Sequence, residues 1–125
     1  MAVLDLMSGK PIQNVLTRGS RGQTFRLIVQ RLNPQQLASI RNRLDAMIAG
    51  SEIHTSSWMP GNDWNGTPFQ AIYDVAAQGD KQTSAMMFGL LVWEAFERHP
   101  EDWFTGKFEK DGVQIEGRTY FKRQY

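Results

Sequence analysis

The spacing of apolar side chains changes along the chain, and each spacing predicts a different element. Over residues 24–32, Phe25, Leu27 and Val29 alternate with Arg26, Ile28 and Gln30. Alternation of β-branched and aromatic residues is typical of a strand with one face in the core and a wetter opposite face. We therefore predict a strand over residues 24–32.

Residues 34–50 show helical spacing instead. Their apolar positions recur every three or four residues, at Leu37, Ile40, Leu44, Met47 and Ile48. Asn33 followed by Pro34 provides a cap and a proline at the first helical position, and Gly50 is a natural stop. These signals predict a helix over 34–50, and the arginines that lie off its apolar stripe make it a candidate contact surface.

A second helix is predicted over residues 81–99, and it is apolar almost all round. A helix without a polar face belongs inside a core, so Met87, Leu90 and Leu91 are expected to be buried. A shorter helix is predicted to begin at the Thr-Pro pair at 67–68, which resembles the start of the helix over 34–50.

Two strands are predicted near the carboxyl end, over residues 103–108 and 113–122. The Asp-Gly pair between them is a strong signal for a hairpin turn. With the strand over 24–32, this hairpin predicts an α+β fold in which a small antiparallel sheet packs on two to three helices. We expect one domain over residues 1–125, with residues 1–22 as a flexible or extended arm.

Composition narrows the class of protein. The chain has 125 residues, of which 41% are hydrophobic and 22% charged, and this suits one globular domain. It has no cysteine, so disulfides, thiolate metal sites and cysteine nucleophiles are excluded. No apolar run is long enough to cross a bilayer and no secretory leader is visible. These features predict a cytoplasmic protein that spans no membrane.

Charge is divided along the chain, although the net charge is only +1. Residues 1–50 hold seven basic against two acidic side chains, residues 51–103 two against eight, and residues 104–125 five against three. Oppositely charged segments can pack together and cancel, or the basic segments can form a face for a polyanion. The second interpretation makes the following side chains candidate nucleic-acid contacts: Arg18, Arg21, Arg41, Arg43, Lys107, Lys110, Arg118, Lys122 and Arg123.

A long connection over residues 51–68 carries two tryptophans among many turn residues. Loops of this length without regular structure are often functional, and tryptophan is enriched at binding hot spots. We predict a partner-binding loop that uses Trp58, Met59, Asp63 and Trp64. The alternative is that the aromatic rings fold back and cap the core.

No catalytic motif is recognisable. The chain has no phosphate loop, dinucleotide fingerprint, His-Glu-x-x-His zinc motif or nucleophile elbow, so no cofactor and no metal site are expected. The residues that most resemble a hydrolase site are Glu52, His54, Ser56, Ser57 and Asp63, but these residue types also form turns and caps. We therefore expect that the chain is not an enzyme and assign no catalytic residue.

These observations predict a small accessory, regulatory or inhibitor protein that binds a macromolecule, in the first place another protein. Its size and lack of motifs suit a protein of a bacterial phage or mobile element, and a homodimer is left open. The alternative is a nucleic-acid-binding module that uses the basic amino-terminal arm and the hairpin, because three helices followed by a hairpin is the element order of a winged helix. Against it, residues 87–93, which would have to read bases, are apolar.

Overall fold

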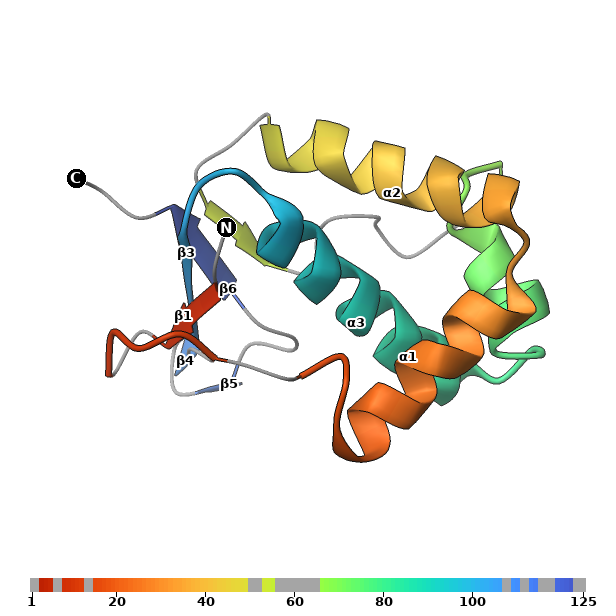
Figure 1. The fold of residues 1–125 in the computed structure, drawn as a ribbon, viewed down its shortest axis with the longest axis horizontal. Coiled ribbons are helices and arrows are strands. Elements are labelled where there is room, and N and C mark those ends of the chain that lie inside the picture. Colours follow the sequence, from red (N-terminus) through yellow and green to blue (C-terminus); the bar gives the residue numbers. More distant parts are fainter. Residues whose placement is uncertain are drawn as a thin grey trace.

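Helices and a small mixed sheet make up the part of the chain that the computed structural model describes, which is residues 3–5, 8–12, 15–49, 53–55, 66–106, 109–110, 113–114 and 119–122. The elements are β1 (Val3–Asp5), α1 (Gly19–Arg31), α2 (Pro34–Ala49), β2 (Ile53–Thr55), η1 (Ile72–Ala76), α3 (Lys81–Arg98), β3 (Trp103–Gly106), β4 (Glu109–Lys110), β5 (Val113–Gln114) and β6 (Thr119–Lys122). Figure 1 shows the sheet toward one end of the molecule, on the left, and α1 toward the other, with α3 between them.

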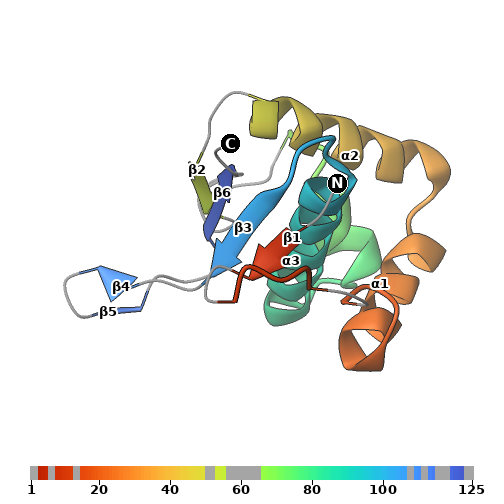
Figure 2. The ribbon, with the colours of Figure 1, turned by 60° about the vertical axis from the view of Figure 1, so that its left-hand side comes forward.

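The central element of the core is α3. It contacts α1, α2, η1 and β1, and Figure 2 shows the sheet on one side of it and α1 on the other. Met87, Leu90 and Leu91 are buried, so the prediction for these three side chains is confirmed. A helix with apolar side chains around most of its circumference is stable only where other elements enclose it.

Aromatic rings join α3 to the sheet. Phe96 stacks on Tyr120 of β6 with the ring centroids 3.9 Å apart, and it meets the ring of Trp103 in β3 edge to face at 4.8 Å. Trp93, one turn earlier in α3, meets Tyr120 at 6.4 Å. Because stacked and edge-to-face pairs add attraction to the burial of large apolar areas, these rings hold the helix against the sheet.

The four-stranded sheet has the strand order β1-β3-β6-β2. β1 runs parallel to β3, with Leu4 opposite Phe104, whereas β6 pairs antiparallel with both β3 and β2. β4 and β5 form a separate antiparallel pair, which Figure 2 shows apart from the larger sheet. A strand from the start of the chain is therefore paired with one that follows α3.

The predicted fold class is wrong. The described chain is mostly helical, and residues 24–31 of the strand predicted over 24–32 belong to α1. The sheet is mixed, because β1 is parallel to β3. The single hairpin predicted from residues 103–108 and 113–122 is not formed as such: β3 and β6 are the inner strands of the four-stranded sheet, and β4 and β5 pair only with each other.

The spacing of buried side chains explains why residues 24–31 are helical. Ile28 and Leu32 are buried and Phe25 packs against the core, at intervals of three and four residues. Leu27 and Val29, which the alternating pattern would have placed with Phe25 on one face of a strand, are exposed. Burial therefore follows the helical period, and the alternation carries no structural information here.

The helices predicted over residues 34–50 and 81–99 are confirmed as α2 and α3. α2 begins with a reciprocal cap: Asn33 Oδ1 accepts from the Gln36 N–H at 2.7 Å, and Gln36 Oε1 accepts from the Asn33 N–H at 3.0 Å. Such a pair satisfies two amides that have no partner inside the helix.

The short helix predicted from 67–68 onward contains a π-helical turn, η1. The Ala77 N–H donates to the Ile72 carbonyl at 2.8 Å, and the Gly79 N–H donates to the Tyr73 carbonyl at 2.7 Å. Arg31 Nη1, from the last turn of α1, donates to the Ala76 carbonyl at 2.7 Å. A cation at the carboxyl end of a helix is favourable, and this contact ties α1 to η1.

Gly22 is required by a close approach near the start of α1. A Cβ at this position would lie 2.6 Å from the Thr17 carbonyl carbon, and only a backbone movement would relieve that contact. We expect Gly22→Ala to lower the free energy of unfolding by about 1–3 kcal/mol, measured by urea denaturation. Gly89 in α3 is the matched control, because a Cβ there meets nothing within 4 Å. Gly89→Ala is expected to raise stability by about 0.5–1 kcal/mol through helix propensity; equal effects of the two variants would contradict the close approach.

Asp80 caps the start of α3, where its carboxylate accepts from the Thr83 hydroxyl at 2.7 Å and from the Gln82 N–H at 3.2 Å. The Thr83 hydroxyl is the main cause that holds the pKa of this carboxyl below its usual value. The cap therefore stabilises the fold at neutral pH, and its contribution is lost as the pH falls through the lowered pKa. We expect Asp80→Ala to lower the melting temperature at neutral pH and to lower it less in strong acid, and a difference that does not change with pH would rule out the role of the charge.

Candidate functional site

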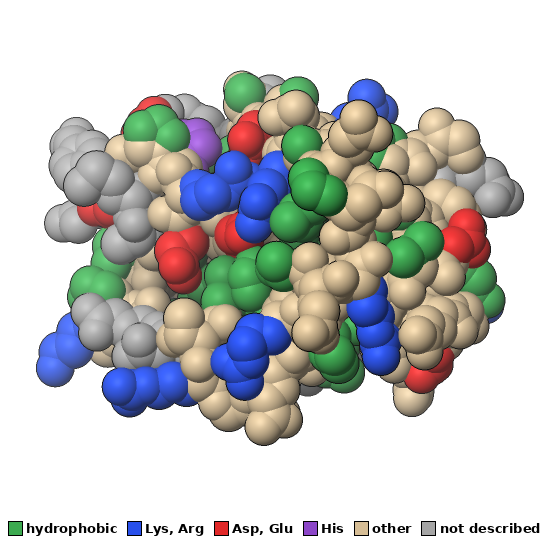
Figure 3. Space-filling view, turned by 45° about the vertical axis from the view of Figure 1, so that its right-hand side comes forward, with side chains coloured by type: hydrophobic (Ala, Val, Ile, Leu, Met, Phe, Trp, Pro, Cys, Tyr) green, Lys and Arg blue, Asp and Glu red, His purple; other side chains and the backbone are tan. Residues whose placement is uncertain are grey.

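Three helices surround an open groove on the surface of the protein. It has a volume of about 380 Å³ and is lined by Val29, Leu32, Pro34, Leu37, Ala38, Arg41, Asn42 and Arg98. We call it the three-helix groove. Its wall is apolar where α1 passes into α2, and Arg41 and Arg98 bring two guanidinium groups to it. On the face drawn in Figure 3, an apolar area lies between two groups of basic side chains, with acidic side chains next to the upper group.

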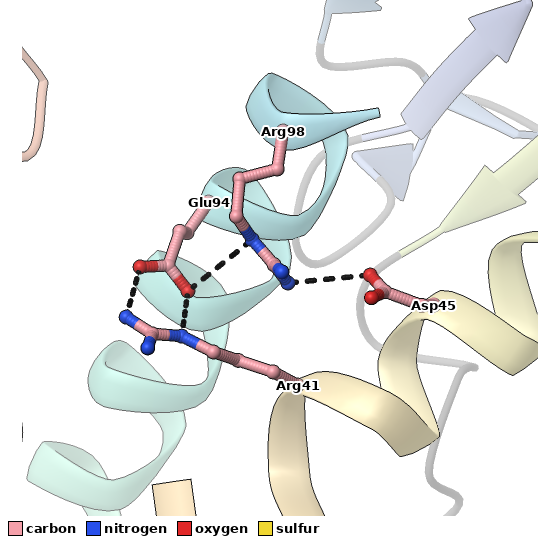
Figure 4. Close-up of polar contacts among 4 residues, drawn as sticks. All are labelled: Arg41, Asp45, Glu94 and Arg98. Carbon is pink, nitrogen blue, oxygen red and sulfur yellow. Dashed lines mark hydrogen bonds and ion pairs between the residues drawn. The ribbon is translucent and has the colours of Figure 1, made fainter. Parts of the chain in front are cut away.

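Four charged side chains link α2 to α3 beside this groove (Figure 4). Arg41 donates to both carboxylate oxygens of Glu94, from Nε at 2.8 Å and from Nη2 at 2.6 Å. Arg98 Nη2 lies 3.2 Å from an oxygen of Asp45, and Arg98 Nε lies 3.8 Å from Glu94. The four charges cancel, so the groups form a link between helices and not an unpaired anion site.

The Arg41–Glu94 pair is the stronger half of this link. Only 11% of the Glu94 side chain is exposed, against 33% of Arg41. The hydrogen bonds that Arg41 donates to Glu94, together with the negative charge of that carboxylate, raise the pKa of Arg41 against the opposing effect of burial. A two-point contact of this kind fixes both side chains, so the guanidinium of Arg41 is held in place at the groove.

A second hollow lies along α1 and adjoins the first through Val29. It is lined by Leu16, Thr17, Gln23, Phe25, Arg26, Leu27, Val29 and Gln30; we call it the α1 hollow. Among the described residues, the large apolar side chains that are exposed are Leu27 at 37%, Val29 at 45% and Met86 at 52%. Two of the three therefore lie on α1. Since successive helical residues are turned by about 100°, Arg26 projects between Leu27 and Val29.

The charge of α1 is one-sided. Its sequence, Gly19–Arg31, contains Arg21, Arg26 and Arg31 and no acidic residue. Arg18, which precedes it, and Arg21 and Arg26 have no ion pair within the described part of the chain. Exposed arginines beside exposed aliphatic side chains are an arrangement found at protein interfaces.

The predicted site residues differ in exposure and in pairing, and several lie outside the described residues. Of the candidate nucleic-acid contacts, Arg18, Arg21 and Arg43 are exposed, whereas Arg41 is paired with Glu94. Lys110 lies in β4 and Lys122 in β6. The candidates outside the described residues are Lys107, Arg118 and Arg123, together with the predicted loop residues Trp58, Met59, Asp63 and Trp64.

Most of the residues that resemble a hydrolase site lie outside the described residues. His54 lies in β2, and Glu52, Ser56, Ser57 and Asp63 are outside the described residues. In the part of the chain that is described, no three His, Asp or Glu side chains are grouped so that they could hold a metal ion. The helices described there include none with the length and apolar character needed to cross a membrane. The side chains that line the two hollows offer apolar contact, hydrogen bonds and charge pairing to a binding partner.

The sequence patterns did not reveal the two hollows. The alternating pattern places Leu27 and Val29 on one face of a strand, whereas both are exposed on α1. A usable signal was present, because Phe25, Ile28 and Leu32 have helical spacing and leave Leu27 and Val29 off the buried stripe. The groove itself has no signal in the sequence, since it depends on how three helices cross.

Glu94 is expected to contribute more to stability than its neighbour Asp45. Glu94→Gln removes the charge opposite Arg41 in a mostly buried position, and we expect it to lower the free energy of unfolding by about 1–3 kcal/mol. Asp45→Asn, the control, removes a carboxylate from an exposed pair and is expected to cost about 0–1 kcal/mol. The measurement is urea denaturation of both variants, and similar losses would contradict the assignment of the stronger contact to Arg41–Glu94.

No protein-family model, curated protein sequence or solved structure that was compared matches this chain. The function is therefore inferred from the geometry of the groove, the α1 hollow and the charges around them.

Proposed function

We propose that this chain is a binding protein that acts on another protein, and that it uses the surface formed by the three-helix groove and the α1 hollow. The observation that carries the proposal is the position of Val29. This exposed apolar side chain lines both hollows, and arginines border it on both sides, Arg26 in one hollow and Arg41 in the other. The role that follows is regulatory: the protein occupies a surface of its partner and alters what the partner does.

The residue types around Val29 support a protein partner. Interfaces between proteins have an apolar centre, and arginine is enriched there because its stem packs on apolar surface while its guanidinium pairs with carboxylates. Leu27 and Val29 would contribute nothing to a phosphate backbone, which is bound through cations and hydrogen-bond donors.

Binding of nucleic acid is the second candidate, and one observation favours it. Arg18, Arg21 and Arg26 are exposed without an ion pair in the described residues, and such side chains can bind phosphates. The winged-helix version of this function has less support, because Met87 and Leu91 of α3, the helix that would have to enter the major groove, are buried.

A photo-crosslinker tests the proposed surface directly. We expect a photoreactive amino acid at Gln30, which is exposed and lines the α1 hollow, to form a covalent adduct with a protein in the cells that produce this chain. The adduct should survive nuclease treatment, and mass spectrometry should identify the same crosslinked protein in repeated experiments.

The matched control places the same photoreactive group at Gln82, which is exposed on α3 and lines neither hollow. It should give no adduct with that partner. Adducts at Gln30 that disappear with nuclease would support the second candidate instead, and equal adducts from both positions would contradict the assignment of the surface.

A further inference from the structure

The partner's side of the interface can be described further, on the basis of the proposed function. We propose that the surface around Val29 receives an acidic segment with one apolar side. An aliphatic or aromatic side chain of that segment enters the three-helix groove beside Val29, and its carboxylates meet Arg26 in the α1 hollow and Arg41 in the groove. The inference rests on the charge, the apolar exposure and the shape of this surface.

Positive charge remains around α1 after the helices have packed. Residues 15–49 contain one acidic side chain, Asp45, and six arginines. These are Arg18, Arg21, Arg26, Arg31, Arg41 and Arg43. Glu94 crosses from α3 and neutralises Arg41, while Asp45 pairs with Arg98 of α3. None of the described ion pairs reaches the arginines around α1, so the local surplus is positive and complementary to carboxylates.

The same surface has an apolar component. Val29 is 45% exposed at the point that the two hollows share. Pro34 and Ala38, also exposed, continue the apolar lining into the three-helix groove, and Leu32 and Leu37 are the buried residues behind them. A polyanion without apolar groups would leave this lining in water, whereas a segment with an apolar side removes it from water.

Two arginines lie at the far end of the groove. Arg41 is fixed by its two bonds to Glu94, so it offers its remaining donors without a change of conformation. Arg98, at 3.2 Å from Asp45 in an exposed pair, is held less firmly. A carboxylate of the incoming segment can therefore also be received at this end, which makes an apolar side chain between two carboxylates the arrangement that fits the groove.

A designed probe tests this inference without knowledge of the natural partner. The probe is a fluorescent helical peptide about as long as α1, made of Glu with Leu at i, i+3, i+4 and i+7. Two comparison peptides replace every Leu by Ser or every Glu by Lys. We expect fluorescence anisotropy to show saturable binding of the Glu/Leu peptide to the full chain and binding at least about tenfold weaker for both comparison peptides.

Variants locate the binding. Val29→Ser and Arg26→Gln are each expected to weaken binding of the Glu/Leu peptide by about tenfold, the size of a moderate hot spot. The controls are Met86→Ser, which removes an exposed apolar side chain from α3, and Arg43→Gln, which removes an exposed charge from α2. They should bind as the parent does, and circular dichroism melts of all four establish that they are folded.

Three results would overturn the inference. The first is equal binding of the Glu/Leu and Glu/Ser peptides with displacement by a DNA oligonucleotide, which identifies a polyanion site. The second is self-association of the chain in sedimentation that is lost in Val29→Ser, because a second copy then occupies the surface. The third is no peptide binding at all; in that case a nuclease-resistant adduct at Gln30 would still support the proposed function, so the two failures are distinguishable.

Discussion

The need to enclose α3 determines the arrangement of the other elements. This helix has buried side chains from Ser84 onward around most of its circumference, among them Met87, Leu91 and Phe96. Burial of one such side chain contributes about 1.5–3 kcal/mol, so a structure that left a side of α3 in water would lose several of these contributions. α1 and α2 cover it from one direction, and the sheet covers it from the other through Trp103 and Tyr120.

Enclosure of α3 also decides where charge is neutralised. Glu94 lies among the buried residues of this helix, and a carboxylate in that position needs a partner. Arg41 of α2 supplies it, which couples the packing of α2 on α3 to one ion pair. Packing therefore neutralises part of the segmented charge, because the mainly basic segment 1–50 meets the mainly acidic segment 51–103 at the Arg41–Glu94 pair. The arginines around α1 take no part in this cancellation.

The surface properties of α1 follow from its limited contact with the core. It buries Gly22, Ile28 and the flank that carries Phe25, whereas Arg26, Leu27, Val29 and Gln30 are exposed. Leu27 and Val29 are exposed because a helix cannot place residues two apart on the same side as those three or four apart. Val29 is thus an exposed apolar side chain that lines the same hollow as Arg26.

The sequence by itself determined α2 and α3, the burial of Met87, Leu90 and Leu91, and the segmentation of charge. These properties depend on local spacing and composition: a stripe at three- and four-residue intervals, caps such as Asn33, and a run without polar residues. The tertiary structure alone decided that β1 pairs in parallel with β3 and that Val29 lies between two hollows. Each of these outcomes depends on contacts between residues far apart in the chain, and no local pattern contains that information.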